Sequence, residues 1–369
     1  AKVWHAAARR RCLCPPRRRP SCSSGSHIAS MRASWTARNM CIVAAAGVFT
    51  LGNMGSRQIV GIFKLSIDAA LGNGQTFATA VAMREVLWGA VSPFAGHVAQ
   101  RHGFGKVLAL GLLVYTAGVM ASSLSARRPW LFVLCFVVCG VGAGMTAIPV
   151  VLAATSSLLP ARARPLASSM ITAAASIGTA ALAPAFRRLL SDHGWEVGIL
   201  VLGGMTLPLL PLTLVLRTRS DGAANKPASA APKPGAASGG GDSFVSVVLR
   251  GFSQRNYTCL VLGFFSCGAY VAHIVTHLPA FVETSGVSKA NSALTLTVIC
   301  VINVAGSLSA GALSRAFPSR QHHILCAIYS ARALSSALFA SLPVSTASTF
   351  AFCAVTGVIW LSTVPLTFD

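Results

Sequence analysis

Long apolar blocks, separated by short polar gaps, run along most of the chain. Each block is about 20 residues long, which is the length of an α-helix that crosses the hydrocarbon core of a bilayer. The blocks predict ten membrane-spanning helices, near residues 40–67, 76–99, 107–125, 130–154, 167–189, 197–216, 257–281, 292–314, 322–342 and 346–367. The expected fold class is therefore an all-α polytopic membrane protein.

A stretch rich in Ala, Gly, Ser and Pro separates the sixth block from the seventh, at residues 220–243. Such a composition cannot pack a core and is typical of a flexible linker. The predicted domains are a basic disordered tail at 1–38, a six-helix bundle at 39–217, a cytoplasmic linker at 218–250 and a four-helix bundle at 251–369.

The two ends of the sequence indicate a fragment, because it begins with Ala1 and stops at Asp369 inside an apolar block. The first 38 residues are rich in Arg and contain no acid, as in a mitochondrial or plastid transit peptide. The alternatives are a solvated basic tail or translated sequence upstream of a true start at Met31.

The composition narrows the function further. The chain is 54% hydrophobic and only 10% charged, whereas about a quarter of the residues in a soluble domain are charged. Its net charge of +22 would suit nucleic acid, but the basic residues lie between the apolar blocks and line no single surface, which argues against a nucleic-acid partner. We expect no cofactor and no metal, because even His273 and His277, four residues apart, lack a nearby carboxylate or Cys. One embedded acid and no Ser/His/acid arrangement argue against an enzyme.

The Lys and Arg residues predict the orientation, since cytoplasmic loops carry an excess of both. With the N-terminus in the cytoplasm, the opposite side holds only Arg127, Arg128, Arg187, Arg188 and Lys289. The expected location is a multi-pass membrane protein with a cytoplasmic N-terminus. The plasma membrane is the first expectation, with an organelle membrane as the alternative.

One polar gap has an ordered pattern, GHVAQRHGFGKV at 96–107, between the second and third blocks. Gly96 is expected to let two helix ends approach closely, and Gly103 and Gly105 to permit a tight reversal. Arg101 and Lys106 can reach the carbonyls at helix C-termini. A degraded second copy, GALSRAFPSR, follows the eighth block. The residues expected to form a cytoplasmic gating loop are Gly96, Gln100, Arg101, Gly103, Lys106, Gly311 and Arg315.

GHVAQRHGFGKV resembles the loop signature of the major facilitator superfamily, Gly-x-x-x-Asp-Arg-x-Gly-x-(Arg/Lys)-(Arg/Lys). Further stretches resemble the monocarboxylate-porter and oxalate/formate-antiporter branch: SRQIVGIF (56–63), LWGAVSPFAG (87–96), THLPAF (276–281), IYSARAL (328–334) and GVIWLSTVPLT (357–367). The resemblance implies twelve helices in two pseudo-repeat bundles, of which the last two helices are missing here. It also implies secondary transport of a small organic anion by alternating access, coupled to protons or to exchange.

The sequence departs from the family pattern at several positions. The loop Asp is replaced by Gln100, and the second copy has Arg315 and Ala316 at the Asp and Arg positions. The basic residue of the eighth span has no counterpart, and apolar residues surround Asn303. A non-transporting membrane sensor or a truncated pseudo-transporter is therefore the alternative function. Multidrug efflux is a weaker one, because the signatures of drug antiporters are poorly matched.

Ionisable residues inside the predicted spans are functional candidates, since charge is costly in a bilayer. Arg57 is expected to face the central cavity and attract an anion, because its guanidinium matches a carboxylate. Glu85 is the candidate for proton coupling, paired with Arg57 or Arg84; the alternative is a purely structural ion pair. Lys64 is expected to extend to the outer interface. The residues expected to bind the substrate are Arg57, Gln58, Arg84, His277, Asn303, Arg332, Trp360 and Thr363.

Overall fold

The computed structural model describes residues 36–72, 74–125, 128–160, 163–217, 249–317 and 320–363, in which all regular elements are helical. Most of the linker and most of the basic tail predicted from the sequence lie outside these residues. The N-terminal bundle contains α2 (Ala37–Gln58), η1 (Val60–Phe63), α3 (Lys64–Leu71), α4 (Thr76–His102), α5 (Phe104–Ser123), α6 (Pro129–Met145), α7 (Ile148–Leu158), α8 (Arg164–Gly204), η3 (Leu207–Leu209) and α9 (Leu212–Val215). The C-terminal bundle contains α11 (Arg255–Thr284), α12 (Lys289–Ala316), α13 (Gln321–Ser341) and α14 (Thr346–Ile359).

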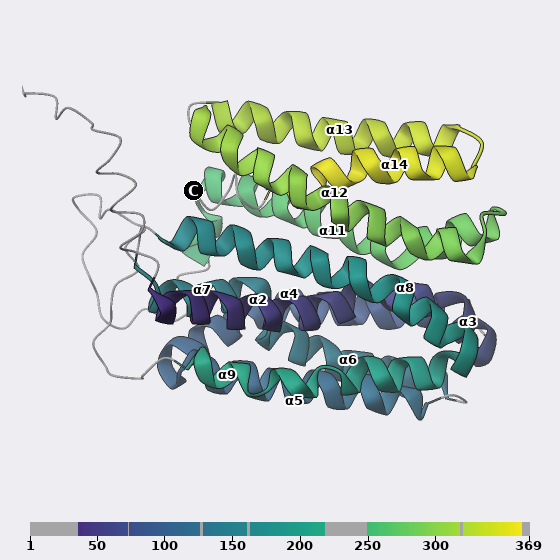
Figure 1. Cartoon of the computed structure of the whole chain (residues 1–369), viewed down its shortest axis with the longest axis horizontal. Coiled ribbons are helices and arrows are strands. Elements are labelled where there is room, and N and C mark those ends of the chain that lie inside the picture. Colours follow the sequence, from purple (N-terminus) through teal and green to yellow (C-terminus); the bar gives the residue numbers. More distant parts are fainter. Residues whose placement is uncertain are drawn as a thin grey trace, which may run out of the picture.

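The helices lie roughly along one direction, in two groups placed side by side (Figure 1). Helix α8 includes two of the predicted spans, because the chain reverses at Gly194 and returns toward α9 (Figure 1). Gly194 has a φ of 82°, a conformation that costs glycine little and L-residues with a side chain much more. The fifth and sixth spans are therefore joined by a single residue and not by the short loop that the sequence predicted.

Six helices in the described part of the chain are long and apolar enough to cross a membrane: Phe104–Ser123, Pro129–Leu158, Leu166–Val215, Tyr257–Thr284, Lys289–Ala310 and Gln321–Ser341. Thr346–Ile359 is a shorter apolar helix. Helices α2 and α4 are outside this set, and they carry Arg57 and the pair Arg84–Glu85. The helical membrane fold predicted from the apolar blocks is confirmed.

Three of the predicted spans are interrupted within their length, and the sixth span changes from α8 to η3 and α9 after Gly204. The first changes from α-helix to a 3₁₀ turn at η1. The fourth breaks at Thr146 and Ala147, and α7 resumes at Ile148 with Pro149 in its first turn, where a missing N–H does no harm. Such breaks free backbone carbonyls inside the bundle, and in a membrane those carbonyls need donors from the protein.

The two ends of the bundles can be named after glycines in left-handed conformations. The Gly72 end holds the turns at Gly72, Gly194 and Gly286, and the Gly103 end holds the turn between α4 and α5. The bundles contact each other mainly through α8 with α12 and through α11 with η1. At Gly61 the contact is so close that a Cβ would lie 2.0 Å from the carbonyl oxygen of Val275. The structure is therefore closed toward the Gly72 end.

Candidate functional site

Arg57 lies in the last turn of α2, and its side chain is buried inside the N-terminal bundle. Its Nη2 donates to the carbonyl oxygen of Ala143 at 3.0 Å and to Oγ1 of Thr146, where α6 ends. The guanidinium also lies over the rings of Trp88, at 5.7 Å, and Tyr115, at 5.1 Å. A cation thus sits at the C-terminus of a helix, where the helix dipole favours positive charge.

Arg332 occupies a corresponding position in the C-terminal bundle. It is 3% exposed, and its Nη2 donates to the carbonyl oxygens of Ile359, at 2.8 Å, and Trp360, at 2.6 Å, where α14 ends. Its guanidinium lies over Tyr270, at 5.4 Å, and Tyr329, at 5.3 Å. We call Arg57, Trp88, Tyr115, Ala143 and Thr146 the Arg57 cluster, and Arg332, Tyr270, Tyr329, Ile359 and Trp360 the Arg332 cluster.

Neither guanidinium has a carboxylate partner in the described part of the chain, and each keeps one buried nitrogen without a hydrogen-bond partner there. This nitrogen is Nε in Arg57 and Nη1 in Arg332. Nε1 of Trp360 is likewise buried and unpaired. The two clusters therefore place positive charge and unpaired hydrogen-bond donors inside the helical bundles. An anion has the chemistry to balance such a charge and to accept from such donors.

Arg84 and Glu85 form an ion pair with each other, with Nη2 of Arg84 2.5 Å from Oε1 of Glu85. Of the two partners expected for Glu85, the structure thus shows Arg84. Arg84 and Tyr115 also border a small internal cavity of about 10 Å³, room for about one water molecule. The backbone of Arg84 packs on Gly140, the first glycine of a Gly-x-x-x-Gly motif in α6.

Asn303 connects the two bundles near the middle of α12. Its Nδ2 donates to Oγ of Ser176 on α8 at 2.7 Å, and its Oδ1 accepts from the backbone N–H of Leu361 at 3.0 Å. Gln58 forms a bond within the N-terminal bundle, between α2 and α8, where its Oε1 accepts from Oγ1 of Thr179 at 2.8 Å. Thr363 lies 3.4 Å from Sγ of Cys267. These predicted substrate residues lie at helix contacts.

His277 lines the larger cavity, of about 680 Å³, between the start of α3 and helices α11, α13 and α14. His273 is beside it, with ring centroids 5.1 Å apart, and Lys64 is also in the wall. Lys64 forms an ion pair within α3, with its Nζ 2.5 Å from Oδ2 of Asp68, and its extension to the outer interface stays a prediction. Arg57 and Arg332 are not among the residues that line this cavity.

The sequence profile of the Major Facilitator Superfamily matches residues 43–369. The chain belongs to the major facilitator superfamily. The resemblance inferred from the loop signature is confirmed.

Several curated relatives of this major facilitator chain are named for monocarboxylates. Monocarboxylate transporter 13 of Rattus norvegicus is 25% identical over 258 residues, covering 70% of this chain and 56% of the relative. Monocarboxylate transporter 14 of Homo sapiens is 28% identical over 132 residues, covering 36% of this chain and 26% of the relative. The riboflavin transporter MCH5 of Saccharomyces cerevisiae is 27% identical over 230 residues, covering 58% of this chain and 41% of the relative. The chain thus spans about half or less of the relatives it matches.

Solved structures of the superfamily share the fold. The partially occluded inward open form of the xylose transporter XylE from E. coli superposes with a TM-score of 0.61 at 14% identity, covering 89% of this chain and 87% of that one. An inward-facing bacterial homologue of the human lysosomal transporter Spinster gives a TM-score of 0.56 at 16% identity, covering 90% and 74%. At these identities the likeness supports the fold alone.

The loop with the superfamily signature differs in detail from the expectation. Gly103 makes the reversal, with a φ of 94°. Gly105 lies instead in α5, where a Cβ would be 2.6 Å from the carbonyl oxygen of Thr213, so it permits close packing on α9. The close approach expected at Gly96 is not present, because no atom lies within 4 Å of a Cβ built there.

The remaining loop residues lie at the same end of the molecule. Gln100 and Arg101 are exposed in the last turn of α4, and Lys106 is exposed in the first turn of α5. Gly311 and Arg315 belong to the last turns of α12, and the contacts expected of them lie outside the part of the chain described here. Their gating role stays a prediction.

Sequence reasoning missed the aromatic and backbone partners of the two arginines. The chain has only four Tyr residues, and three of them, Tyr115, Tyr270 and Tyr329, stack on a buried guanidinium. This scarcity was a usable signal, because a rare residue placed inside apolar blocks often has a specific partner. The carbonyl acceptors carry no such signal, since every residue has one.

Proposed function

We propose that the protein is a secondary active transporter that moves a small, monocarboxylate-like organic anion across a membrane by alternating access. The observation that carries the proposal is the pair of buried guanidiniums, Arg57 and Arg332, whose partners in the described chain are carbonyls, a hydroxyl, a thioether and aromatic rings. An unpaired charge inside a membrane is costly, and an anionic substrate would compensate it. Membership of the superfamily and relatives named for monocarboxylates support the same substrate class.

The proposed cycle uses the two bundles as rigid bodies that rock about a site between them. Arg57, Arg332 and the indole N–H of Trp360 would bind the carboxylate, while Gln58, Asn303 and Thr363 would link its movement to the bundle contacts. Arg84, paired with Glu85, and His277 are secondary candidates. Glu85 is the proposed proton-coupling group, and the N-terminus is proposed to be cytoplasmic.

Uptake of radiolabelled lactate by liposomes that contain the full chain tests the proposal. We expect saturable uptake that Arg57→Gln and Arg332→Gln each reduce at least tenfold. Arg188→Gln, which removes an exposed charge from α8, should leave it unchanged. Under an imposed pH gradient, Glu85→Gln should abolish the dependence on the gradient while preserving lactate exchange. Folding of each variant is checked by its melting temperature.

Two outcomes would overturn the proposal. Uptake that is unchanged in both arginine variants would remove the anion site from these clusters. Lactate binding without uptake would instead favour a non-transporting sensor, which the replacement of the loop acid by Gln100 already suggests as the second candidate.

A further inference from the structure

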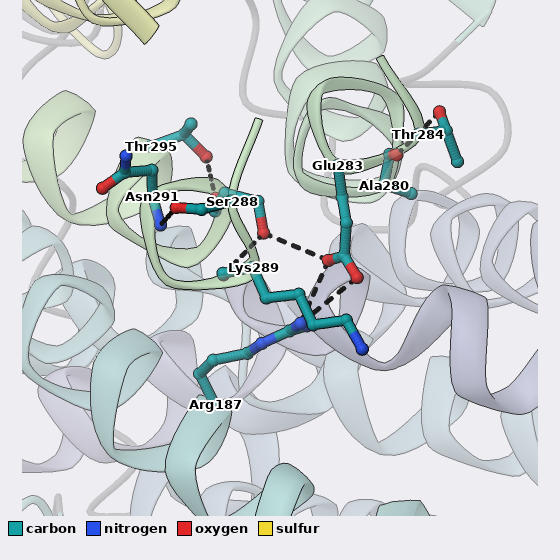
Figure 2. Close-up of polar contacts among 9 residues, drawn as sticks. Arg187, Ala280, Glu283, Thr284, Ser288, Lys289, Asn291 and Thr295 are labelled. Carbon is teal, nitrogen blue, oxygen red and sulfur yellow. Dashed lines mark hydrogen bonds and ion pairs between the residues drawn. The ribbon is translucent and has the colours of Figure 1, made fainter. Parts of the chain in front are cut away.

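An ion pair joins the two bundles near the Gly72 end (Figure 2). Nη2 of Arg187, on α8, lies 3.1 Å from Oε2 of Glu283, on α11, and donates to Oε1 at 3.2 Å. Both side chains are 16% exposed. One guanidinium nitrogen thus contacts both oxygens of a half-buried carboxylate.

The local fold of the C-terminal bundle holds Glu283 in place. Helix α11 ends at Thr284, and Gly286, with a φ of 97°, lets the chain reverse into α12. Ser288 caps α12 by accepting from the N–H of Asn291 at 3.3 Å. Ser292 lies in the first turn of α12, and its Oγ donates to Oε2 of Glu283 at 3.2 Å. The carboxylate is therefore oriented by its own bundle before it meets Arg187.

The position of this pair sets it apart from the other described ion pairs. Lys64–Asp68 and Arg84–Glu85 each stay within the N-terminal bundle. Arg187–Glu283 instead joins α8 to α11, and it follows the polar contacts between α8 and α12, which include the bond from Oγ1 of Thr297 to the carbonyl oxygen of Ala180 at 3.1 Å. Together these contacts run from the middle of the interface to the closed end.

We propose that Arg187 and Glu283, with Ser292 as a positioning residue, form a latch that holds the Gly72 end closed. The inference rests on the proposed transport function, in which this end must open once in each cycle. Opening separates α8 from α11, so the ion pair breaks and both charges return to water. The latch stabilises the state in which the Gly72 end is closed. This end can then open only when the ion pair breaks.

The environment of the pair suits a latch that opens. Charges that are mostly buried interact more strongly than fully exposed ones, which contribute little. Each side chain nevertheless keeps a path to solvent, so separation leaves no stranded charge inside the bilayer. We expect the latch to shift the ratio of the two states by about tenfold, a usual size for conformational coupling.

Hydrogen exchange of the intact chain in lipid nanodiscs, followed by mass spectrometry, tests the latch without any substrate. Glu283→Gln and Arg187→Gln should each raise exchange about tenfold in η1 and the end of α11, since those segments open together. Exchange at the Gly103 end, around the ends of α4 and α7, should fall, because that end closes as the other opens. Simple destabilisation would instead raise exchange at both ends.

Matched variants separate the ionic contact from a general effect of charge. Arg188→Gln and Glu196→Gln remove one exposed charge each from α8 and should exchange like the natural protein. The charge exchange Arg187→Glu with Glu283→Arg should restore most of the protection that either single change removes. The latch is rejected if Glu283→Gln leaves exchange unchanged at both ends, or if the exchanged pair behaves like the single variants.

Lactate uptake by the same variants separates the two proposals. A shift in hydrogen exchange with no uptake by any form of the protein would sustain the latch and reject transport. Lactate uptake by the natural protein, together with unchanged hydrogen exchange in Glu283→Gln, would support transport and reject the latch. If both proposals hold, Glu283→Gln should change the maximal rate of uptake more than the lactate concentration at half-maximal rate.

Discussion

Each bundle has a buried arginine beside a helix C-terminus, that of α6 in the N-terminal bundle and that of α14 in the C-terminal bundle, but the two arginines belong to helices at different places in the chain order. In the N-terminal bundle the guanidinium comes from α2 and the stacked Tyr115 from α5. In the C-terminal bundle the ring of Tyr270 comes from α11, the first helix, and Arg332 from α13, the third. The difference indicates that the environment of the guanidinium, beside carbonyls at a helix C-terminus inside the bundle, matters more than which helix carries the arginine.

The acceptors also differ between the clusters. The Arg57 cluster uses one carbonyl and the hydroxyl of Thr146, whereas the Arg332 cluster uses two carbonyls. A mutation can remove a hydroxyl but not a carbonyl. The Arg57 cluster is therefore open to tuning by substitution at the acceptor, and the Arg332 cluster is not.

The largest effects are expected where one close helix crossing supports each cluster. A Cβ at Gly178 would lie 2.1 Å from the carbonyl oxygen of Leu51, and one at Gly306 would lie 2.2 Å from that of Val358. Gly178→Ala and Gly306→Ala should each lower the free energy of unfolding in detergent by about 3 kcal/mol, since the backbones must separate. Gly268→Ala, with nothing within 4 Å, should leave it unchanged or raise it by up to about 1 kcal/mol. A loss confined to one bundle would show that the clusters are not equally supported.

The aromatic rings give the next largest effect. Tyr115→Leu and Tyr270→Leu should each cost about 2 kcal/mol of stability, because a desolvated cation loses a ring face. Tyr115→Phe and Tyr270→Phe keep the face and should lose less than half as much. Thermal unfolding in detergent measures both pairs. Equal losses for Phe and Leu would assign the contact to the hydroxyl groups, which lie 3.3 Å from Ser56 and Thr356.

Much of this fold could be predicted from the sequence, and less of the site. The apolar blocks predicted the helices, and Gly103 predicted the reversal between α4 and α5, because both are local properties of the chain. Arg57, Arg332 and Glu85 stood out as charges among apolar residues. The turn at Gly194 did not, because its sequence was not distinguished from that of other glycines.

Partners far apart in sequence were beyond the pattern altogether. The sequence placed Arg187 among the basic residues opposite the cytoplasmic side, and it assigned no role to Glu283. Only the folded arrangement, in which α8 lies beside the end of α11, brings them within 3.1 Å. The same holds for Arg332 and Ile359, which are 27 residues apart.

The smallest expected effect sharpens the difference between the acceptors. Thr146→Val removes the hydroxyl that accepts from Arg57 and should cost about 1 kcal/mol of stability, while Thr146→Ser should keep most of it. Trp360→Phe leaves the carbonyl acceptor of Arg332 in place and should not weaken that bond. The measurement is chemical unfolding with each single variant and with the corresponding arginine variants. Additive losses for Thr146→Val and Arg57→Gln would show that the two residues do not interact.

Gly61 has a consequence for how fast the closed end can part. At this point η1 meets α11 backbone to backbone, with no side chain between them. Interdigitated side chains must change rotamer before two helices separate, whereas a contact made by backbone atoms alone needs no such change. At Gly61 the two segments can therefore part without any side-chain rearrangement, and the resistance to opening comes from the buried side chains and polar contacts on either side of it.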